Sequence, residues 1–110
     1  MMVTEKIKRF FPTVQFTAGD TVAKIDRTME GFPEYGASFL YVYVSSTSKV
    51  RLAINGAPAS SINTTGLLIT NFAASPFGLK LENIRINKIE YVRDSTESGD
   101  VVFNMLIGFE

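Results

Sequence analysis

Apolar and polar residues alternate along this chain in short segments, without the longer period of an amphipathic helix. The segments are rich in Val, Ile, Phe, Tyr and Thr, and clusters of Gly, Pro, Asn, Asp and Ser separate them. Turn signals recur about every ten residues, a spacing typical of all-β sandwiches and barrels. The pattern therefore predicts an all-β fold, an antiparallel β-sandwich or jelly roll of about eight strands.

Three pairs of neighbouring segments are predicted to form hairpins. The first turns at Gly19-Asp20, the second within 45–48, and the last within the acidic loop 94–100. In each pair, apolar residues meet apolar residues across the expected register, as cross-strand pairs on one face of a sheet should. Representative predicted pairs are Phe16 with Ala23, Tyr41 with Leu52, and Tyr91 with Phe103.

The apolar run at 79–93 changes its alternation phase twice, near Glu82-Asn83 and near Asn87-Lys88. A change of phase within a strand requires a bulge or a tight corner. We therefore expect a bend or two separate strands in this run.

The domain organisation is predicted to be simple. Residues 1–12 offer both a helical and a strand pattern, neither long enough to decide, and are interpreted as an amino-terminal arm, whereas residues 13–110 form one sandwich domain. A chain of this length can bury one core without disulfides or metals. Within the domain, the region 27–37 is rich in Gly and Pro and is predicted to be a long irregular connection.

The segment 39–44 is apolar on both faces, unlike its neighbour 49–54, which alternates. The predicted hairpin register assigns one face of 39–44 to the core and leaves the other face unexplained. The assigned core face consists of Phe39, Tyr41 and Tyr43, and the reverse face consists of Leu40, Val42 and Val44 beside Lys49 and Arg51.

An aliphatic stripe left in water would forgo about 1.5–3 kcal/mol for each side chain, so a cover is expected. Three covers are open: the arm or the 27–37 connection, a neighbouring subunit, or a small ligand. The arm ends in a hydrophobic Phe-Phe-Pro sequence and is a second adhesive element. The candidate interface residues are Leu40, Val42, Val44, Lys49, Arg51, Phe10 and Phe11.

Charge and residue usage narrow the classes of function. Lys plus Arg and Asp plus Glu both number 11, so no net field favours nucleic acid or an anionic membrane. The chain contains no Cys and no His, the residues most used for thiol chemistry, metal ligation and base catalysis. We expect a protein that is not an enzyme, with no cofactor, no metal, no nucleic-acid partner and no membrane partner.

Targeting signals are also not apparent in the sequence. No apolar run reaches the roughly 18–20 residues of a membrane span, and the amino end lacks the apolar region of a secretory signal. The expectation is synthesis in a cytoplasm without processing.

Carboxylates offer the remaining candidate chemistry. Glu82 with Glu90, or Glu30 with Glu34, could act as an acid–base pair, but their spacing gives no support and solvated surface charge is expected. The acidic loop 94–100 supplies three carboxylates but lacks the spacing of a known calcium loop. An ordinary polar hairpin tip is the favoured interpretation.

Aromatic residues raise the question of carbohydrate binding, because flat rings stack on sugar faces. The predicted hairpins turn Tyr41, Tyr43 and Tyr91 inward, which weakens that idea. The candidate ligand platform is then limited to aromatic residues in turns and loops. These residues are Phe32, Tyr35 and Phe77.

Stretches such as "FLYVYVSSTSKVRLAING" and "LENIRINKIEYVRD" are typical of small β domains with Ser, Thr and Asn turns. In this general pattern the chain resembles tailed-phage virion proteins, in particular head-decoration or cement proteins and small tail-associated β-sandwiches. This resemblance implies a non-catalytic structural subunit in the virion, made in the host cytoplasm. Its partners would be further copies of itself, as a homo-oligomer, and other virion proteins.

A second resemblance is to galactose-binding-like jelly rolls, in which a segment like "INKIEYVR" forms a late core strand. It implies a carbohydrate-binding module with a glycan ligand. The chain departs from that pattern because a further strand follows at 101–109 and because it has no Trp. Carbohydrate binding is therefore the alternative function.

Overall fold

A computed structural model of the chain describes residues 8–9, 15–26, 28, 32, 36–44, 47–56, 61–70 and 79–109. These residues form nine strands and one short helix, and eight of the strands have four or more residues. The elements are β1 (Lys8–Arg9), β2 (Gln15–Ala18), β3 (Ala23–Asp26), β4 (Ala37–Tyr43), β5 (Lys49–Ile54), α1 (Ile62–Thr65), β6 (Leu67–Thr70), β7 (Leu79–Ile86), β8 (Lys88–Arg93) and β9 (Val101–Phe109). The predicted all-β class is confirmed.

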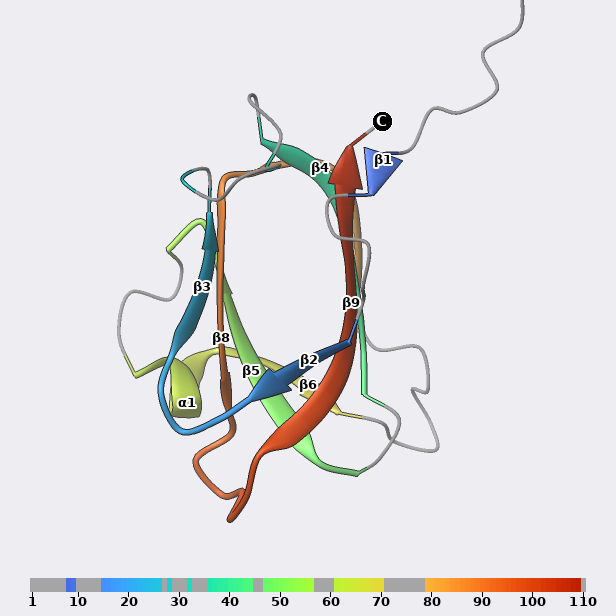
Figure 1. The fold of residues 1–110 in the computed structure, drawn as a ribbon. Coiled ribbons are helices and arrows are strands. Elements are labelled where there is room, and N and C mark those ends of the chain that lie inside the picture. Colours follow the sequence, from blue (N-terminus) through green and yellow to red (C-terminus); the bar gives the residue numbers. More distant parts are fainter. Residues whose placement is uncertain are drawn as a thin grey trace, which may run out of the picture.

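The strands form two antiparallel sheets that face each other (Figure 1). Sheet A has the order β2–β9–β4–β7, and β1 pairs with the same side of β9 as β2 does, further along the strand. Sheet B has the order β3–β8–β5–β6. In Figure 1 sheet B is the left wall, with β3 and β8 in front, and β4 and β9 belong to the right wall.

This strand order is that of a jelly roll. Strands β2, β3, β4 and β5 pair antiparallel with β9, β8, β7 and β6, respectively, so these eight strands form one long hairpin of four strand pairs. Rolling that hairpin brings β9 beside β4 and β8 beside β5, and both of these additional pairings are present. The result is the double-Greek-key sandwich that defines the jelly roll.

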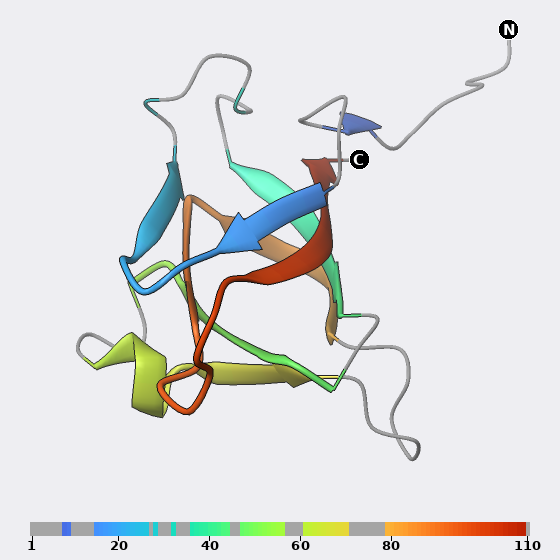
Figure 2. The same cartoon turned by 60° about the horizontal axis from the view of Figure 1, so that its bottom comes forward.

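All three predicted hairpins are wrong, because each turn carries the chain from one sheet to the other. β2, β4 and β9 belong to sheet A, whereas β3, β5 and β8, which were expected beside them, belong to sheet B. Figure 2 shows the same cartoon turned so that these connections can be followed. The alternation of apolar and polar residues identifies the buried side of each strand. It does not tell whether two matching strands lie side by side in one sheet or face each other across the core.

The two predicted phase changes in 79–93 are both present. Asn83 has a positive φ of 60°, and the register between β4 and β7 shifts in its neighbourhood. At Asn87 the chain leaves sheet A, so that β7 and β8 are separate strands in different sheets.

The side chain of Asn55 holds this corner. Its Nδ2 donates to the carbonyl oxygen of Arg85 at 2.8 Å, and its Oδ1 accepts from the backbone N–H of Asn87 at 2.7 Å. Asn55 and Gly56 both have positive φ, 57° and 85°, a conformation suited to Asn-Gly turns. The turn after β5 therefore recognises the backbone of the corner between β7 and β8.

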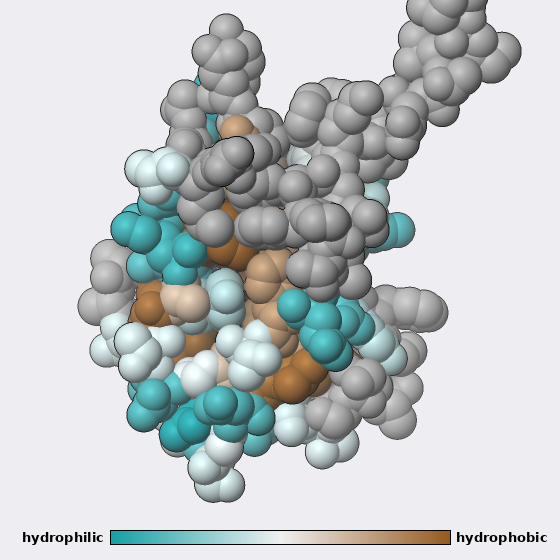
Figure 3. All heavy atoms as spheres, in the orientation of Figure 1, coloured by the Kyte–Doolittle hydropathy of each residue, from teal (hydrophilic) through white to brown (hydrophobic). Residues whose placement is uncertain are grey.

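The core lies between the sheets, and apolar residues occupy the space between them in Figure 3. Leu40, Val42 and Val44 belong to this core and are at most 1% exposed. The prediction that these three residues form an outer stripe is therefore wrong. Because β5 lies across the core from β4 rather than beside it, the predicted register reversed the two faces of β4.

Aromatic rings pack at one part of the core. Tyr91 makes edge contacts with Phe16 and Phe103, with ring centroids 6.0 and 5.3 Å apart. Burial raises the pKa of Tyr91. The inward orientation that was predicted for Tyr91 agrees with this packing.

Helix α1 covers part of the outer face of sheet B. Ile62 packs with Ala53 of β5 and Val92 of β8 in a small second apolar cluster. Gly66 follows the helix in such close contact that a Cβ there would lie 2.5 Å from the carbonyl oxygen of Ile62. A glycine is needed here for close approach, since its φ of −64° is open to any residue.

Candidate functional site

The outer face of sheet A is the second apolar surface of β4. Tyr41 lies directly opposite Leu106 of β9 and Lys80 of β7, and Tyr43 lies opposite Asn104. Directly opposite residues in an antiparallel pair share a face. Since Leu40 and Val42 point into the core, Tyr41 and Tyr43 point away from it. The predicted inward orientation of these two tyrosines is wrong.

Exposure varies across this face. Val102 is 51% exposed and Tyr43 is 38% exposed, whereas Tyr41 and Leu106 are half-buried. Phe39 is only 3% exposed, although it belongs to neither core cluster, and its ring centroid lies 5.1 Å from that of Tyr41. The predicted burial of Phe39 is confirmed, but on the opposite face of the sheet from the one expected.

Charged side chains on this face, among those that the structure describes, are confined to the edge strand β7. Lys80 lies opposite Tyr41, and its Nζ is 5.4 Å from the centroid of the tyrosine ring, a cation–π contact. Glu82 lies opposite Phe39. On β2 and β9 the residues of this face are uncharged: Gln15, Thr17, Val102, Asn104 and Leu106. We use the name outer face of sheet A for these uncharged residues, for Lys80 and Glu82, and for Phe39, Tyr41 and Tyr43.

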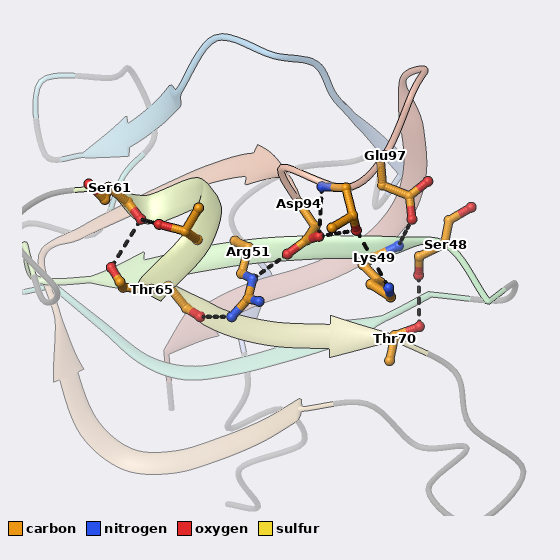
Figure 4. A network of polar contacts seen from close by, with 11 residues as sticks. Ser48, Lys49, Arg51, Ser61, Thr65, Thr70, Asp94 and Glu97 are labelled. Atoms are coloured by element: carbon orange, nitrogen blue, oxygen red, sulfur yellow. Dashed lines mark hydrogen bonds and ion pairs between the residues drawn. The ribbon is translucent and has the colours of Figure 1, made fainter.

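Lys49 and Arg51 lie on sheet B, away from this face, and take part in a polar network (Figure 4). Arg51 Nε is 2.6 Å from Asp94 Oδ1, and Arg51 also donates to the carbonyl oxygen of Gly66 at 2.7 Å. The backbone N–H of Lys49 donates to Glu97 Oε2 at 2.9 Å. The two cations are therefore not beside Leu40, Val42 and Val44 as predicted, and this network fastens the β8–β9 connection to β5.

Asp94 is the buried acid of this network. It is 2% exposed and accepts hydrogen bonds from the side chain and backbone of Thr96 as well as from Arg51. The hydroxyl of Thr96 and, to a smaller extent, Arg51 lower the pKa of Asp94 to about 2. Asp94 is therefore ionised at neutral pH, and its role in this network is structural.

A shallow polar hollow of about 200 Å³ lies next to this network. Its lining consists of Asp20, Asn63, Arg93, Asp94, Ser95 and Glu97. The acidic loop 94–100 uses its carboxylates internally: Asp94 and Glu97 as above, and Asp100 as the partner of Arg93 at 3.5 Å. Within the described ranges, no group of three or more His, Cys, Asp or Glu side chains is placed to hold a metal ion.

The carboxylate pairs considered from sequence do not form a site in the described structure. Glu82 is on the outer face of sheet A, whereas Glu90 is on sheet B and pairs with Lys88 at 3.7 Å. The sandwich therefore separates them. Glu30 and Glu34 lie outside the described residues.

The predicted aromatic platform is not assembled in the described structure. Phe32 is 9% exposed and belongs to the core cluster, so its assignment as an exposed ring is wrong. Tyr35 and Phe77 lie outside the described residues, as do Phe10 and Phe11 of the arm. Of the arm, the structure describes Lys8 and Arg9, which pair with Phe109 and Gly108 of β9.

Sequence reasoning assigned Tyr41 and Tyr43 to the core and so did not connect them with Leu106 and Val102, which it had placed on the non-core side of their strand. The signal was the doubled apolar pattern of 39–44, which does mark a second apolar face. Only the strand order assigns that face to the tyrosines.

The described part of the chain contains one helix, α1, whose four residues are far too few to cross a membrane. No family model matches the chain, and neither a curated protein nor a solved structure matches it.

Proposed function

We propose that this chain is a non-catalytic structural subunit of a virus particle, a capsid-decoration or tail-associated protein that acts through subunit interfaces. The observation that carries the proposal is that β4 is apolar on both faces. One face fills the core with Leu40, Val42 and Val44, and the other presents Tyr41 and Tyr43 on the outer face of sheet A. The interface predicted from sequence is thus moved to the opposite side of the same strand.

The composition of this face suits a protein interface. Interface centres are enriched in Tyr and Phe and depleted in charge. Tyr43 and Val102 retain much of their exposure, and the charged residues Lys80 and Glu82 stand at the edge. A neighbouring virion protein would bury the apolar centre and leave the charged rim in water.

The jelly roll supports the same class of function by analogy. This architecture recurs in viral capsid domains and also in lectins. A fold alone does not assign a function, so the analogy raises the expectation without naming a partner.

The experiment that tests the proposal is a count of copies per particle. Particles of the virus that encodes this chain would be purified on a density gradient and digested, and the chain quantified by mass spectrometry against isotope-labelled standards. The proposal requires the chain to be present in several copies per particle. Its absence from washed particles would overturn the proposal.

Carbohydrate binding is the second candidate, and one observation favours it more than the sequence did. Tyr43 is outward rather than inward, and the amide side chain of Asn104 lies directly opposite it on the same face. An aromatic ring beside an amide can stack on a sugar and bond to its hydroxyls. A glycan array would test this candidate: a ligand whose binding is lost in Tyr43→Ala supports it, and no ligand across a broad panel removes it.

A further inference from the structure

Two sheet edges lie on one side of the sandwich. β7 ends sheet A and β6 ends sheet B, and β6 also contacts β4, the strand next to β7. In the ranges that the structure describes, no strand pairs with the outer edge of either. An unpaired edge presents backbone donors and acceptors that can pair with another strand. We name this surface the β6–β7 side.

Two of the three charges of β7 stand symmetrically about Leu81, and the third, Arg85, lies beyond the irregular residue Asn83. Lys80 and Glu82 flank it and share the outer face of the sheet, since they lie opposite Tyr41 and Phe39. Leu81 has the opposite orientation and packs at the margin of the core, where it is partly buried. When a second β7 runs antiparallel to the first about Leu81, the positive charge of each strand therefore lies opposite the negative charge of the other.

We propose that β7 pairs antiparallel with β7 of a second copy of this chain, about a twofold axis that passes through Leu81. In that register Lys80 lies opposite Glu82 of the partner subunit, and Glu82 lies opposite Lys80 of the partner subunit. Leu81 meets Leu81 of the partner subunit on the inner face. An isologous interface requires such self-complementarity. The pairing makes sheet A continuous between the two copies.

The other edge of the same side adds apolar surface. Leu67 is 44% exposed and Leu68 is 38% exposed, both on β6. Edge strands usually carry charges that discourage pairing, but β6 has none. The twofold axis brings β6 of the two copies toward each other, so Leu67, which shares the inner face with Leu52, gains cover together with Leu81.

The positive φ of Asn83 limits the length of the ladder. It ends the regular part of β7 four residues after Leu79. A short ladder buries little area, and interfaces of that size are weak. We therefore expect a dissociation constant on the order of 10–100 µM for the free protein. In a virion this contact would be repeated between many copies. That part of the inference rests on the proposed function, whereas the pairing itself does not.

Charge reversal with rescue tests the register. Association would be measured by sedimentation velocity over a concentration series for the wild type, Lys80→Glu, Glu82→Lys and the double variant. Each single change places like charges opposite each other twice, and we expect association weaker by about tenfold or more. The double variant restores both opposite-charge pairs and should return to within about threefold of the wild type. Lys24→Glu on β3, the far edge of sheet B, is the matched control and should leave association unchanged.

A single cysteine provides a second readout, because the natural chain has none. In Leu81→Cys the two thiols lie opposite each other and should form a disulfide-linked dimer when dissolved oxygen with a copper catalyst is supplied as the oxidant. In Leu79→Cys, two residues along the same edge, the thiol faces Asn83 of the partner subunit instead and should dimerise much more slowly.

A monomeric wild type at about 1 mM, failure of the double variant to recover, or equal cross-linking at positions 79 and 81 would overturn the proposed pairing. Failure of the β7 pairing can be distinguished from failure of the proposed function. If the chain is abundant in particles while the charge variants associate like the wild type, only the β7 pairing is wrong. If the chain is absent from particles but the charge variants show loss and rescue, only the virion setting is wrong.

Discussion

Tyr41 of β4 and Leu106 of β9 lie directly opposite each other, and both side chains are on the outer face of sheet A. One position along each strand, Leu40 and Ile107 form the next opposite pair, and both are buried in the core. The two central strands of this sheet are thus apolar on both faces. The inner face fills the core, and on the outer face Tyr43 and Val102 are 38% and 51% exposed.

Substitutions on the two faces of β4 should separate these roles. Leu40→Ala removes a fully buried side chain and should lower the free energy of unfolding by about 2–5 kcal/mol. Tyr43→Ala removes an exposed side chain and should cost less than about 1 kcal/mol. Urea denaturation followed by circular dichroism measures both. A larger loss for Tyr43→Ala than for Leu40→Ala would contradict the assignment of the faces.

Gly66 should tolerate no side chain. In Gly66→Ala the added Cβ would lie 2.5 Å from the carbonyl oxygen of Ile62 and 3.0 Å from that of Leu52, so α1 or β5 must shift. We expect a loss of about 1–3 kcal/mol in the free energy of unfolding. Gly99→Ala is the control, because nothing lies within 4 Å of a Cβ there, and it should change stability by less than about 0.5 kcal/mol. Equal stabilities of the two variants would be inconsistent with the packing described.

Asp94 should contribute to the acid sensitivity of the fold. Its pKa is lowered in the folded state from 3.8 to about 2. A lowered folded-state pKa means that its contribution is complete above the ordinary pKa and disappears as the pH falls toward about 2. In Asp94→Asn, the decrease in unfolding free energy between pH 5 and about pH 2 should be smaller than in the wild type.

Denaturation curves at several pH values check this prediction. An unchanged pH dependence in Asp94→Asn would show that Asp94 is not a source of the acid sensitivity.

The amide of Asn55 should protect the corner between the sheets. Asn55→Gly accommodates the positive φ but loses the hydrogen bonds to Arg85 and Asn87, and we expect a cost of about 1–3 kcal/mol. Hydrogen exchange at the backbone amide of Asn87 should become faster. Asn55→Asp keeps the acceptor for that amide and should protect it better than Asn55→Gly does. Equal exchange rates in the wild type and both variants would argue against the role of this amide.

The sequence was sufficient for the class of fold and for the local geometry of 79–93, but not for strand partners. The phase changes near Asn83 and Asn87 are local, since a chain cannot reverse its alternation without a bulge or a corner. Pairing is not local: the apolar residues of 49–54 match those of 39–44 equally well across a core or along a sheet. Choosing the side-by-side arrangement reversed the two faces of β4 and assigned Leu40, Val42 and Val44 to the surface. The segment 39–44 does have apolar residues on both faces, but those directed away from the core are Phe39, Tyr41 and Tyr43, of the opposite parity to the predicted stripe.

The polar network could not have been predicted for the same reason. Arg51 and Asp94 are 43 residues apart in sequence, and they meet because β5 lies beside β8 in sheet B. Neither residue stands in a motif. Their ion pair depends on the sheet order alone.

Incorporation of two matched variants into particles tests the central claim most directly, which is that the outer face of sheet A binds a neighbouring virion protein. Val102→Glu places a charge on that face, where Val102 is 51% exposed, and Val22→Glu places the same charge at a residue of similar exposure, 42%, in the connection between β2 and β3. Under the proposed function, tagged variants would be expressed during infection by the virus proposed to carry the chain, and particles would be isolated on a density gradient and quantified for the tag. We predict that the wild type and Val22→Glu co-migrate with particles and that Val102→Glu, folded with wild-type stability, does not. Incorporation of Val102→Glu at the wild-type level would contradict the account.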